Sequence, residues 1–150
     1  MAETEYWFYH LEASPVEGVL PNLLEKTLER GWRSLVRVGK DRLKDLDEHL
    51  WTYRDESFLP HGREDEPMTA YQPVVLSDGL NSADGYQAVF LTGQERVADM
   101  AGAKRCLVMI NGRSAEDTQA CRDYFKELKD AGEDVSYWQQ SRGGRWEKKA

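Results

Sequence analysis

Apolar runs of strand length alternate with segments of helical periodicity along the chain, and this alternation is typical of a sheet layered with helices. The runs that predict strands are Glu5 to Leu11, Ser34 to Val38, Pro73 to Leu76, Ala88 to Thr92 and Arg105 to Ile110. Val135 to Gln139 fits an added edge strand. The pattern therefore predicts an α/β fold with a central sheet of about five strands.

The first predicted strand is strongly aromatic, since Tyr6, Trp7, Phe8 and Tyr9 follow one another. Aromatic side chains favour extended structure, and consecutive rings leave little room for a solvated face. We therefore expect this strand to lie centrally in the sheet or to be covered by other elements.

The first helical segment has a clear start signal but an awkward proline. Ser14, Pro15 and Glu17 resemble a cap, a first-turn proline and a capping-box acid, and an apolar stripe then continues as far as Gly31. Pro21 leaves an alternative open, in which it marks the first turn and the residues before it form a loop.

Two further segments have helical spacing. The second helix is expected after Asp41, which is a suitable cap, and its leucines share one face. The third starts at the cap residue Ser114 and lasts to Ala131, where a glycine ends it. A shorter segment, Gln94 to Ala101, also favours a helix.

The third helix has two different faces. Its apolar stripe consists of Cys121, Tyr124, Phe125 and Leu128. Arg122, Lys126 and Lys129 recur at spacings of four and three residues along an adjoining face. This is the clearest basic stripe in the chain.

The segment LDEHLWTYRDESFLPHG, from Leu46 to Gly62, places Trp51 and Phe58 where a helix passes into a long polar loop. An apolar ring on a charged loop needs a pocket, either in its own domain or in another protein, and such loops commonly carry function. Partner recognition is therefore the leading hypothesis for this segment, and internal packing of the two rings is the alternative.

Composition is typical of a folded protein, with 40% hydrophobic and 31% charged residues among 150. We expect one domain at residues 1–140 and a basic tail at 141–150 that contains Trp146. Neither a secretory signal nor an apolar run of about 20 residues is present in the sequence, so we expect a cytoplasmic protein that does not bind membranes. The net charge of −7 predicts little or no direct DNA binding.

Motifs for phosphate binding, nucleophilic catalysis and zinc are missing: the sequence has no GxxxxGK[ST], GxGxxG, GxSxG or HExxH run. Cys106 and Cys121 are interpreted as small buried hydrophobes. We therefore predict no catalytic residue, no cofactor and no metal. Two alternatives stay open: a small α/β enzyme with a pocket at the carboxyl ends of the strands, and direct binding of single-stranded nucleic acid by the third helix and the tail.

The segment from Leu46 to His61 resembles the central motif of the chi subunit family of the bacterial DNA polymerase III holoenzyme. The match consists of LDEHLW at Leu46 to Trp51 and ESFLPH at Glu56 to His61, preceded by ERGWR at Glu29 to Arg33. The order of the later strands and the long C-terminal helix also fit, so the similarity covers most of the chain.

The resemblance implies a three-layer α/β/α sandwich with a mostly parallel sheet and no enzymatic activity. It implies an adaptor that links the clamp loader, through the psi subunit, to the acidic C-terminal tail of single-stranded-DNA-binding protein. The family's psi contact corresponds to Trp51 and Phe58 here. Its tail contact, made by basic and aromatic residues of the C-terminal helix, corresponds to Arg122, Phe125 and Lys126.

Two positions depart from the family pattern: Thr118 stands where other members have a lysine, and Phe125 lacks the hydroxyl of the tyrosine often found there. Lys129 or the basic tail could offset the loss. An acidic peptide with an apolar end needs cations for its carboxylates and an apolar slot for its ring, and this helix offers both. The alternative is a solvated charged face with Phe125 in the core.

Overall fold

The computed structural model of the protein describes residues 4–12, 15–52, 61–63, 72–141, 143 and 145–149. Its helices are α1 (Val16–Glu29), α2 (Lys40–Thr52) and α3 (Ala115–Asp130). Its strands are β1 (Glu5–Leu11), β2 (Ser34–Arg37), β3 (Gly62–Arg63), β4 (Val74–Ser77), β5 (Ala88–Thr92), β6 (Arg105–Asn111), β7 (Asp134–Gln140) and β8 (Trp146–Lys148).

The described strands form one eight-stranded sheet in the order β3-β4-β2-β5-β6-β1-β7-β8. Neighbouring strands are parallel except for β7 and β8, which are antiparallel. β1 lies inside the sheet, where Phe8 is in register with Val108 of β6 and with Tyr137 of β7. The predicted α/β fold with a mostly parallel sheet is confirmed, with more strands than expected.

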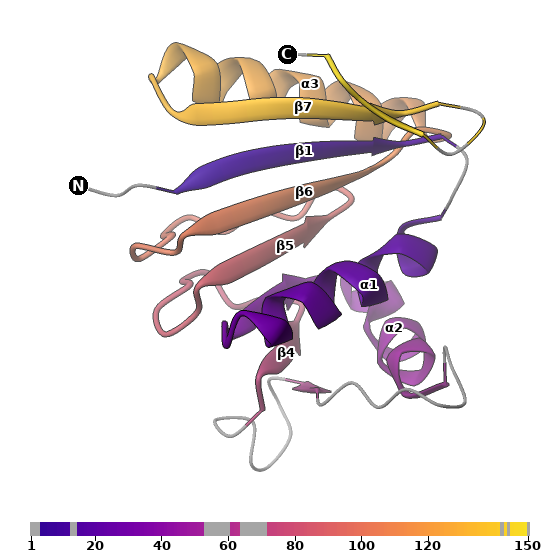
Figure 1. Ribbon diagram of the computed structural model, residues 1–150, viewed down its shortest axis with the longest axis vertical. Coiled ribbons are helices and arrows are strands. Elements are labelled where there is room, and N and C mark those ends of the chain that lie inside the picture. The colour runs from indigo at the N-terminus through magenta and orange to yellow at the C-terminus, as the bar shows by residue number, and fades with distance from the viewer. Residues whose placement is uncertain are drawn as a thin grey trace.

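Helices lie on both faces of the sheet and give the molecule three layers (Figure 1). α1 and α2 lie on one face, and α3 lies on the other, against β6 and β7. Successive side chains of β1 point to opposite faces of the sheet, so this strand packs against the helices of both outer layers. Phe8 is fully buried in the cluster that contains Cys121 of α3, whereas Leu11 belongs to the cluster that contains Leu20 and Leu24 of α1.

α1 resolves the alternative that Pro21 left open, because the helix begins at Val16 and continues through this proline. A proline inside a helix cannot donate to the carbonyl four residues earlier, which here belongs to Glu17. Nε2 of His49, on α2, lies 2.8 Å from that carbonyl oxygen and donates to it. The packing of α2 on α1 thus supplies the hydrogen bond that the proline removes.

The helix predicted for Gln94 to Ala101 is wrong, since this segment forms turns and irregular backbone. The N–H of Glu95 donates to the carbonyl of Thr92 at 3.1 Å. The N–H of Ala98 donates to the side-chain oxygen of Asn81 at 2.8 Å. Contacts with the loop after β4 therefore replace the hydrogen bonds of a helix.

The start of α3 agrees with its prediction, whereas the start of α2 and the edge of the sheet differ from theirs. Oγ of Ser114 accepts the N–H of Asp117 at 3.2 Å, as expected for the cap of α3. Asp41 lies in the first turn of α2 rather than at its cap, because the helix begins at Lys40. β7 is not an edge strand, because β8 pairs along its outer side.

Candidate partner-binding site

The basic stripe predicted on the C-terminal helix is an exposed face of α3. Arg122, Lys126 and Lys129 are all exposed, and at 3.6 residues per turn they fall within an arc of about 60°. Asp123 and Glu127 fall on the far side of this arc from the apolar stripe. α3 therefore presents a positive face next to its apolar stripe, although the helix carries more acidic than basic residues.

Phe125 forms the border between this positive face and the core. Its ring is only partly buried, and it contacts the fully buried ring of Phe8 edge-on, with centroids 5.3 Å apart. Nζ of Lys129 lies 5.7 Å from the Phe125 centroid. One side of the Phe125 ring thus packs in the core, and the other lies next to a cation; contact of this ring with a peptide stays a prediction.

Tyr137 of β7 completes the apolar side of this surface. Its ring meets Phe125 edge-on at 5.5 Å and stacks on Phe8 at 6.2 Å. Burial raises the pKa of Tyr137, and the positive charge of Arg122 opposes the shift without reversing it, so the hydroxyl stays protonated near neutral pH. We define the α3 surface as Arg122, Phe125, Lys126, Lys129 and Tyr137.

The sequence pattern did not single out Tyr137. Alternation along β7 places it on one face with Val135, but no periodicity shows that this face meets α3. Thr118, one turn before Arg122, supplies no cation here, and its hydroxyl is buried without a hydrogen-bond partner among the described residues.

The second predicted surface falls mostly outside the part of the chain that the structure describes. α2 includes the backbone of Trp51, but the side chain of Trp51 and the whole of Phe58 lie outside the described residues. His61, from the same motif, is 1% exposed, and its Nε2 lies 3.0 Å from Oδ1 of Asp47 on α2. The last residue of the motif is thus tied to the helix that carries its first residues.

A cleft of about 620 Å³ opens at the carboxyl ends of β2, β5 and β6, where open α/β sheets commonly bind ligands. Its lining contains four carboxylates and two arginines, which does not favour an anionic ligand. Several lining groups bind each other: Arg42 pairs with Glu17 at 3.0 Å, and the amide of Gln94 donates to Asp117 at 3.3 Å.

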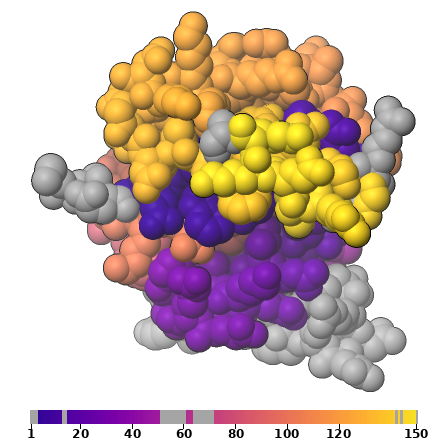
Figure 2. Space-filling view, turned by 45° about the horizontal axis from the view of Figure 1, so that its top comes forward, coloured from indigo at the N-terminus to yellow at the C-terminus, as the bar shows by residue number. Residues whose placement is uncertain are grey.

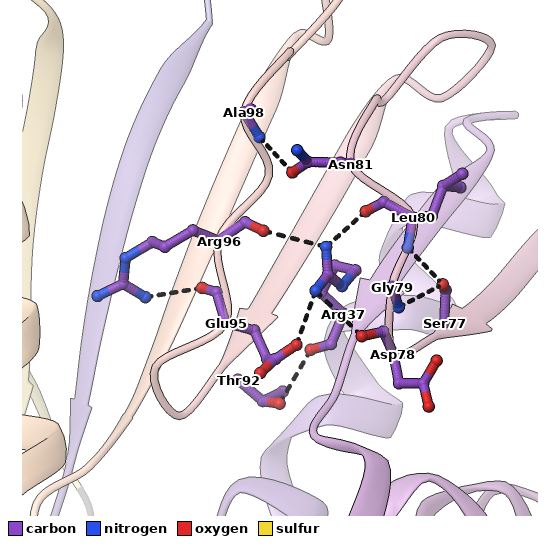
Figure 3. Close-up of polar contacts among 10 residues, drawn as sticks. All are labelled: Arg37, Ser77, Asp78, Gly79, Leu80, Asn81, Thr92, Glu95, Arg96 and Ala98. Atoms are coloured by element: carbon purple, nitrogen blue, oxygen red, sulfur yellow. Dashed lines mark hydrogen bonds and ion pairs between the residues drawn. The ribbon is translucent and has the colours of Figure 1, made fainter.

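Arg37, at the end of β2, fixes the loops beside this cleft (Figure 3). Its buried guanidinium donates through Nη1 to the carbonyls of Leu80 and Arg96, at 2.5 Å and 3.0 Å. Nη2 donates to the carbonyl of Asp78 at 3.2 Å and to the carboxylate of Glu95 at 2.8 Å. These bonds join the loop after β4 to the loop after β5, so Arg37 stabilises the structure rather than facing a ligand.

Both cysteines are buried, as predicted. Burial raises the pKa of Cys106 to about 12 and also raises the pKa of Cys121. Both thiols are therefore protonated near neutral pH, which disfavours nucleophilic attack. Within the described ranges, no three His, Cys, Asp or Glu side chains come together as metal ligands would, and no helix is long and apolar enough to cross a bilayer.

The described part of the C-terminal tail packs back on the sheet. β8 pairs with β7, and the ring of Trp146 meets Tyr9 of β1 edge-on at 5.1 Å. Figure 2 shows the C-terminal segment, in yellow, on the surface beside the indigo residues of the N-terminal region. The division into a domain at residues 1–140 and a tail at 141–150 stays a prediction.

The fold and the α3 surface define a class: an α/β domain with a cationic, apolar-edged helix face suited to binding another macromolecule. The family model of the DNA polymerase III chi subunit (HolC) matches residues 3–136, so the chain belongs to this family. The family is a non-catalytic accessory subunit of DNA polymerase III, which does not support the alternative of a small α/β enzyme.

A similar curated protein is described as a probable DNA polymerase III subunit chi of Rickettsia prowazekii (strain Madrid E). It is 23% identical over 101 residues, which are 67% of this chain and 61% of that protein. The match thus spans about three-fifths of the length of that relative.

Proposed function

We propose that the protein is a replisome adaptor that links the clamp loader, through the psi subunit, to the acidic C-terminal tail of single-stranded-DNA-binding protein. In this proposal the α3 surface holds the acidic tail, and Trp51 and Phe58 contact psi. Membership of the chi family supports the role in DNA replication. A cytoplasmic location follows from the same role.

The observation that carries the proposal is the placement of exposed cations beside a half-covered aromatic ring on α3. Arg122 and Lys126 are one turn apart on the positive face, and Phe125 borders that face with its ring partly exposed. A peptide that ends in an apolar ring and a carboxylate matches both features at once. The net negative charge of the whole protein does not prevent this contact, because the basic side chains of α3 share one face of the helix and the acidic ones lie on another.

The two cations have different tasks in this proposal. The planar guanidinium of Arg122 binds a carboxylate through two parallel N–H donors, while the ammonium of Lys126 acts as a point charge for a second acid of the tail. Because both are exposed, each contact is screened by salt, and the affinity should fall as ionic strength rises. The ring of the peptide packs against Phe125, which supplies the apolar part of the contact.

The test is peptide binding measured by fluorescence anisotropy with a labelled acidic peptide that ends in phenylalanine. Arg122→Ala combined with Lys126→Ala should weaken binding by about 10- to 100-fold, because each lost charge-assisted contact is worth about one factor of ten at a partly exposed site. Lys26→Ala combined with Lys104→Ala is the matched control, since both lysines are exposed and lie away from α3, Lys26 on α1 and Lys104 just before β6.

Phe58→Ala separates the two proposed surfaces. It should leave peptide affinity unchanged but reduce capture of purified psi, with a melting curve close to that of the wild type. Equal peptide affinity in the wild type and the Arg122/Lys126 double variant, with both folded, would show that the tail does not bind at α3. A large loss of stability in Phe58→Ala would show that this ring belongs to the core.

A further inference from the structure

Aromatic rings form a continuous row on the face of the sheet that lies opposite α3. Trp7 and Tyr9 of β1 point to this face, because Phe8 between them points to α3. Trp138 of β7 is in register with Tyr9, and its ring lies 6.4 Å from that of Trp7. The rings of Trp7 and Tyr9 are 6.3 Å apart, and the ring of Trp146 on β8 meets Tyr9 edge-on. The row therefore spans three neighbouring strands.

We call these four rings, Trp7, Tyr9, Trp138 and Trp146, the aromatic row. Trp146 is 37% exposed, and the other three rings are partly exposed. No helix of the described part of the chain lies over this face of β1 and β7 (Figure 1). Adjoining exposed rings are typical of a binding surface, and flat rings pack best against flat rings. The aromatic row thus suits a ligand that has planar groups of its own.

Cations alternate with the rings of this face. The guanidinium of Arg105 lies over the ring of Trp7. The exposed Lys148 of β8 is directly opposite Trp138, and directly opposite residues of an antiparallel pair point to the same face. Rings and cations in alternation are how proteins hold single-stranded nucleic acid, since the bases stack on the rings while the cations attract the phosphates.

The acids of this face lie at one end of it. Glu5 and Asp134 are in register at the amino ends of β1 and β7. Oε2 of Glu5 lies 3.8 Å from Nη2 of Arg105 and accepts the Nε1–H of Trp7 at 3.2 Å. Glu5 therefore balances part of the charge of Arg105, and the plane of this guanidinium is better suited to stacking on a base than to binding a phosphate.

The other end of the face, at β8, has a positive charge. Glu147 precedes Lys148 but points to the α3 side of the sheet, where its carboxylate pairs with Nζ of Lys149 at 3.0 Å. The net charge of −7 predicts only weak attraction of DNA to the surface as a whole. A phosphate beside Trp146 and Lys148 would nevertheless meet a local positive potential.

We propose that the aromatic row binds single-stranded DNA, with bases stacked on Trp146 and its neighbours and a phosphate beside Lys148. This inference goes beyond the proposed function and does not depend on it, because the row and the α3 surface lie on opposite faces of the sheet. The strand must be single, since the bases of a duplex hide their faces by stacking on one another. Membership of a DNA polymerase family favours DNA over RNA.

The first experiment is a titration of a labelled oligothymidylate with the intact chain, measured by fluorescence anisotropy. The wild type should bind at low salt with a dissociation constant of about 10 to 100 µM, as in other binding without sequence preference. Trp146→Leu retains an apolar side chain next to Tyr9 but removes the aromatic face, so it should weaken binding about tenfold. Trp146→Phe retains a ring and should lose less than about threefold. Wild-type affinity in Trp146→Leu, or equal losses in both variants, would overturn the proposal.

The second experiment tests the phosphate contact and has a matched control in the next residue. Each phosphate contact to a single strand adds about 0.7 to the slope of log affinity against log salt concentration. Lys148→Gln should therefore lower this slope by about 0.7. Lys149→Gln should leave the slope unchanged, because Lys149 pairs with Glu147 on the other side of the sheet. A wild-type slope in Lys148→Gln would refute the proposed contact.

A third set of titrations separates the aromatic row from the α3 surface. The variant with Arg122→Ala and Lys126→Ala should keep its affinity for the oligothymidylate, and the acidic peptide should not compete with it. Loss of DNA binding in this variant would place the DNA on α3 and overturn the proposal. Tighter binding of a duplex or of oligouridylate would also overturn it. None of these results decides the adaptor proposal, whose readout is the affinity for the peptide.

Discussion

Along β1, the side chains that point to α3 and those that point to the opposite face meet very different surroundings. Phe8 points to α3 and is 0% exposed, in a cluster closed by Cys121 and by the partly buried Phe125. Trp7 and Tyr9 point the other way and are only half-buried. In Figure 1, α1 and α2 lie toward the β4 side of the sheet, so no helix of the described part of the chain covers this face of β1 and β7.

On this second face, rings and guanidinium groups replace the missing helix. The guanidinium carbon of Arg105 lies 4.1 Å from the ring centroid of Trp7 and 5.4 Å from that of Trp32. That of Arg30 lies 5.0 Å from the same Trp32 ring. We call this set, Arg30, Trp32, Arg105 and Trp7, the cation–π ladder. Rings with polar edges can remain half-exposed, so a sheet face can be closed without an apolar helix.

The comparison shows that one strand can contribute to stability in two ways. Toward α3 it removes apolar area from water, which is worth about 1.5–3 kcal/mol for a fully buried side chain. Toward the ladder it contributes attractions of about 0.5–2 kcal/mol that depend on the position of a charge. The first contribution should be large and insensitive to salt, and the second smaller and specific to arginine.

The largest expected effect comes from Phe8→Ala. Deleting this ring should lower the free energy of unfolding by about 3–5 kcal/mol, because it leaves a cavity under α3 that the neighbouring rings cannot fill. Trp7→Ala, one residue away on the half-exposed face, should cost clearly less. Chemical denaturation of both variants measures the difference, and equal losses would show that the two faces are not distinct.

An intermediate effect is expected from Arg105→Met. Methionine retains the apolar stem but removes the charge that lies between Trp7 and Trp32, so the loss in unfolding free energy should be about 1–2 kcal/mol. Arg30→Met is the control, because Arg30 is exposed and contacts one ring of the ladder, and it should cost less. If the Arg105 variant is as stable as the wild type, the cation–π ladder does not contribute to the free energy of unfolding.

The smallest effect should be visible only at alkaline pH. Burial raises the pKa of Tyr6, on the α3 side, from 10.0 to about 12. The folded state thus keeps a proton that the unfolded state loses, so the contribution of Tyr6 is complete below pH 10.0 and disappears as the pH rises toward 12.

Tyr6→Phe should therefore lose less stability between about pH 9 and pH 11 than the wild type, by at most about 1 kcal/mol after allowance for solvent screening. Tyr9→Phe should show a smaller difference, because Arg105 opposes the rise in the pKa of Tyr9. Urea denaturation at the two pH values compares them. If the pH dependence of stability changed more in Tyr9→Phe than in Tyr6→Phe, the face of β1 that carries Tyr9 would be the better-buried one, contrary to the comparison made above.

Local signals in the sequence predicted much of the fold and part of the candidate site. The cap Ser114 and the cations at four- and three-residue spacing lie within a single helix, so α3 and its positive face could be read directly. The hydrogen bond between His10 and Tyr137 joins residues 127 positions apart, and no periodicity contains that information. The contacts of Arg37 with two loops were missed for the same reason.

The wrong prediction at Gln94 to Ala101 has a similar origin. The segment has helical spacing, but its polar groups bond to other parts of the chain. Arg37 donates hydrogen bonds to the carboxylate of Glu95 and to the carbonyl of Arg96, and the side-chain oxygen of Asn81 accepts the N–H of Ala98. Tertiary hydrogen bonds outweighed a weak local preference.

The position of β1 in the sheet determines the order in which the chain can fold during synthesis. Glu5 pairs with Arg105 and with Asp134, so neither neighbour of β1 exists until most of the chain has left the ribosome. Until then its run of four aromatic residues has no strand to pair with, and unpaired apolar strands are prone to associate with other chains. Chaperone protection of the nascent β1 segment should therefore matter more for the yield of this protein than it does where a strand pairs with the next strand in sequence.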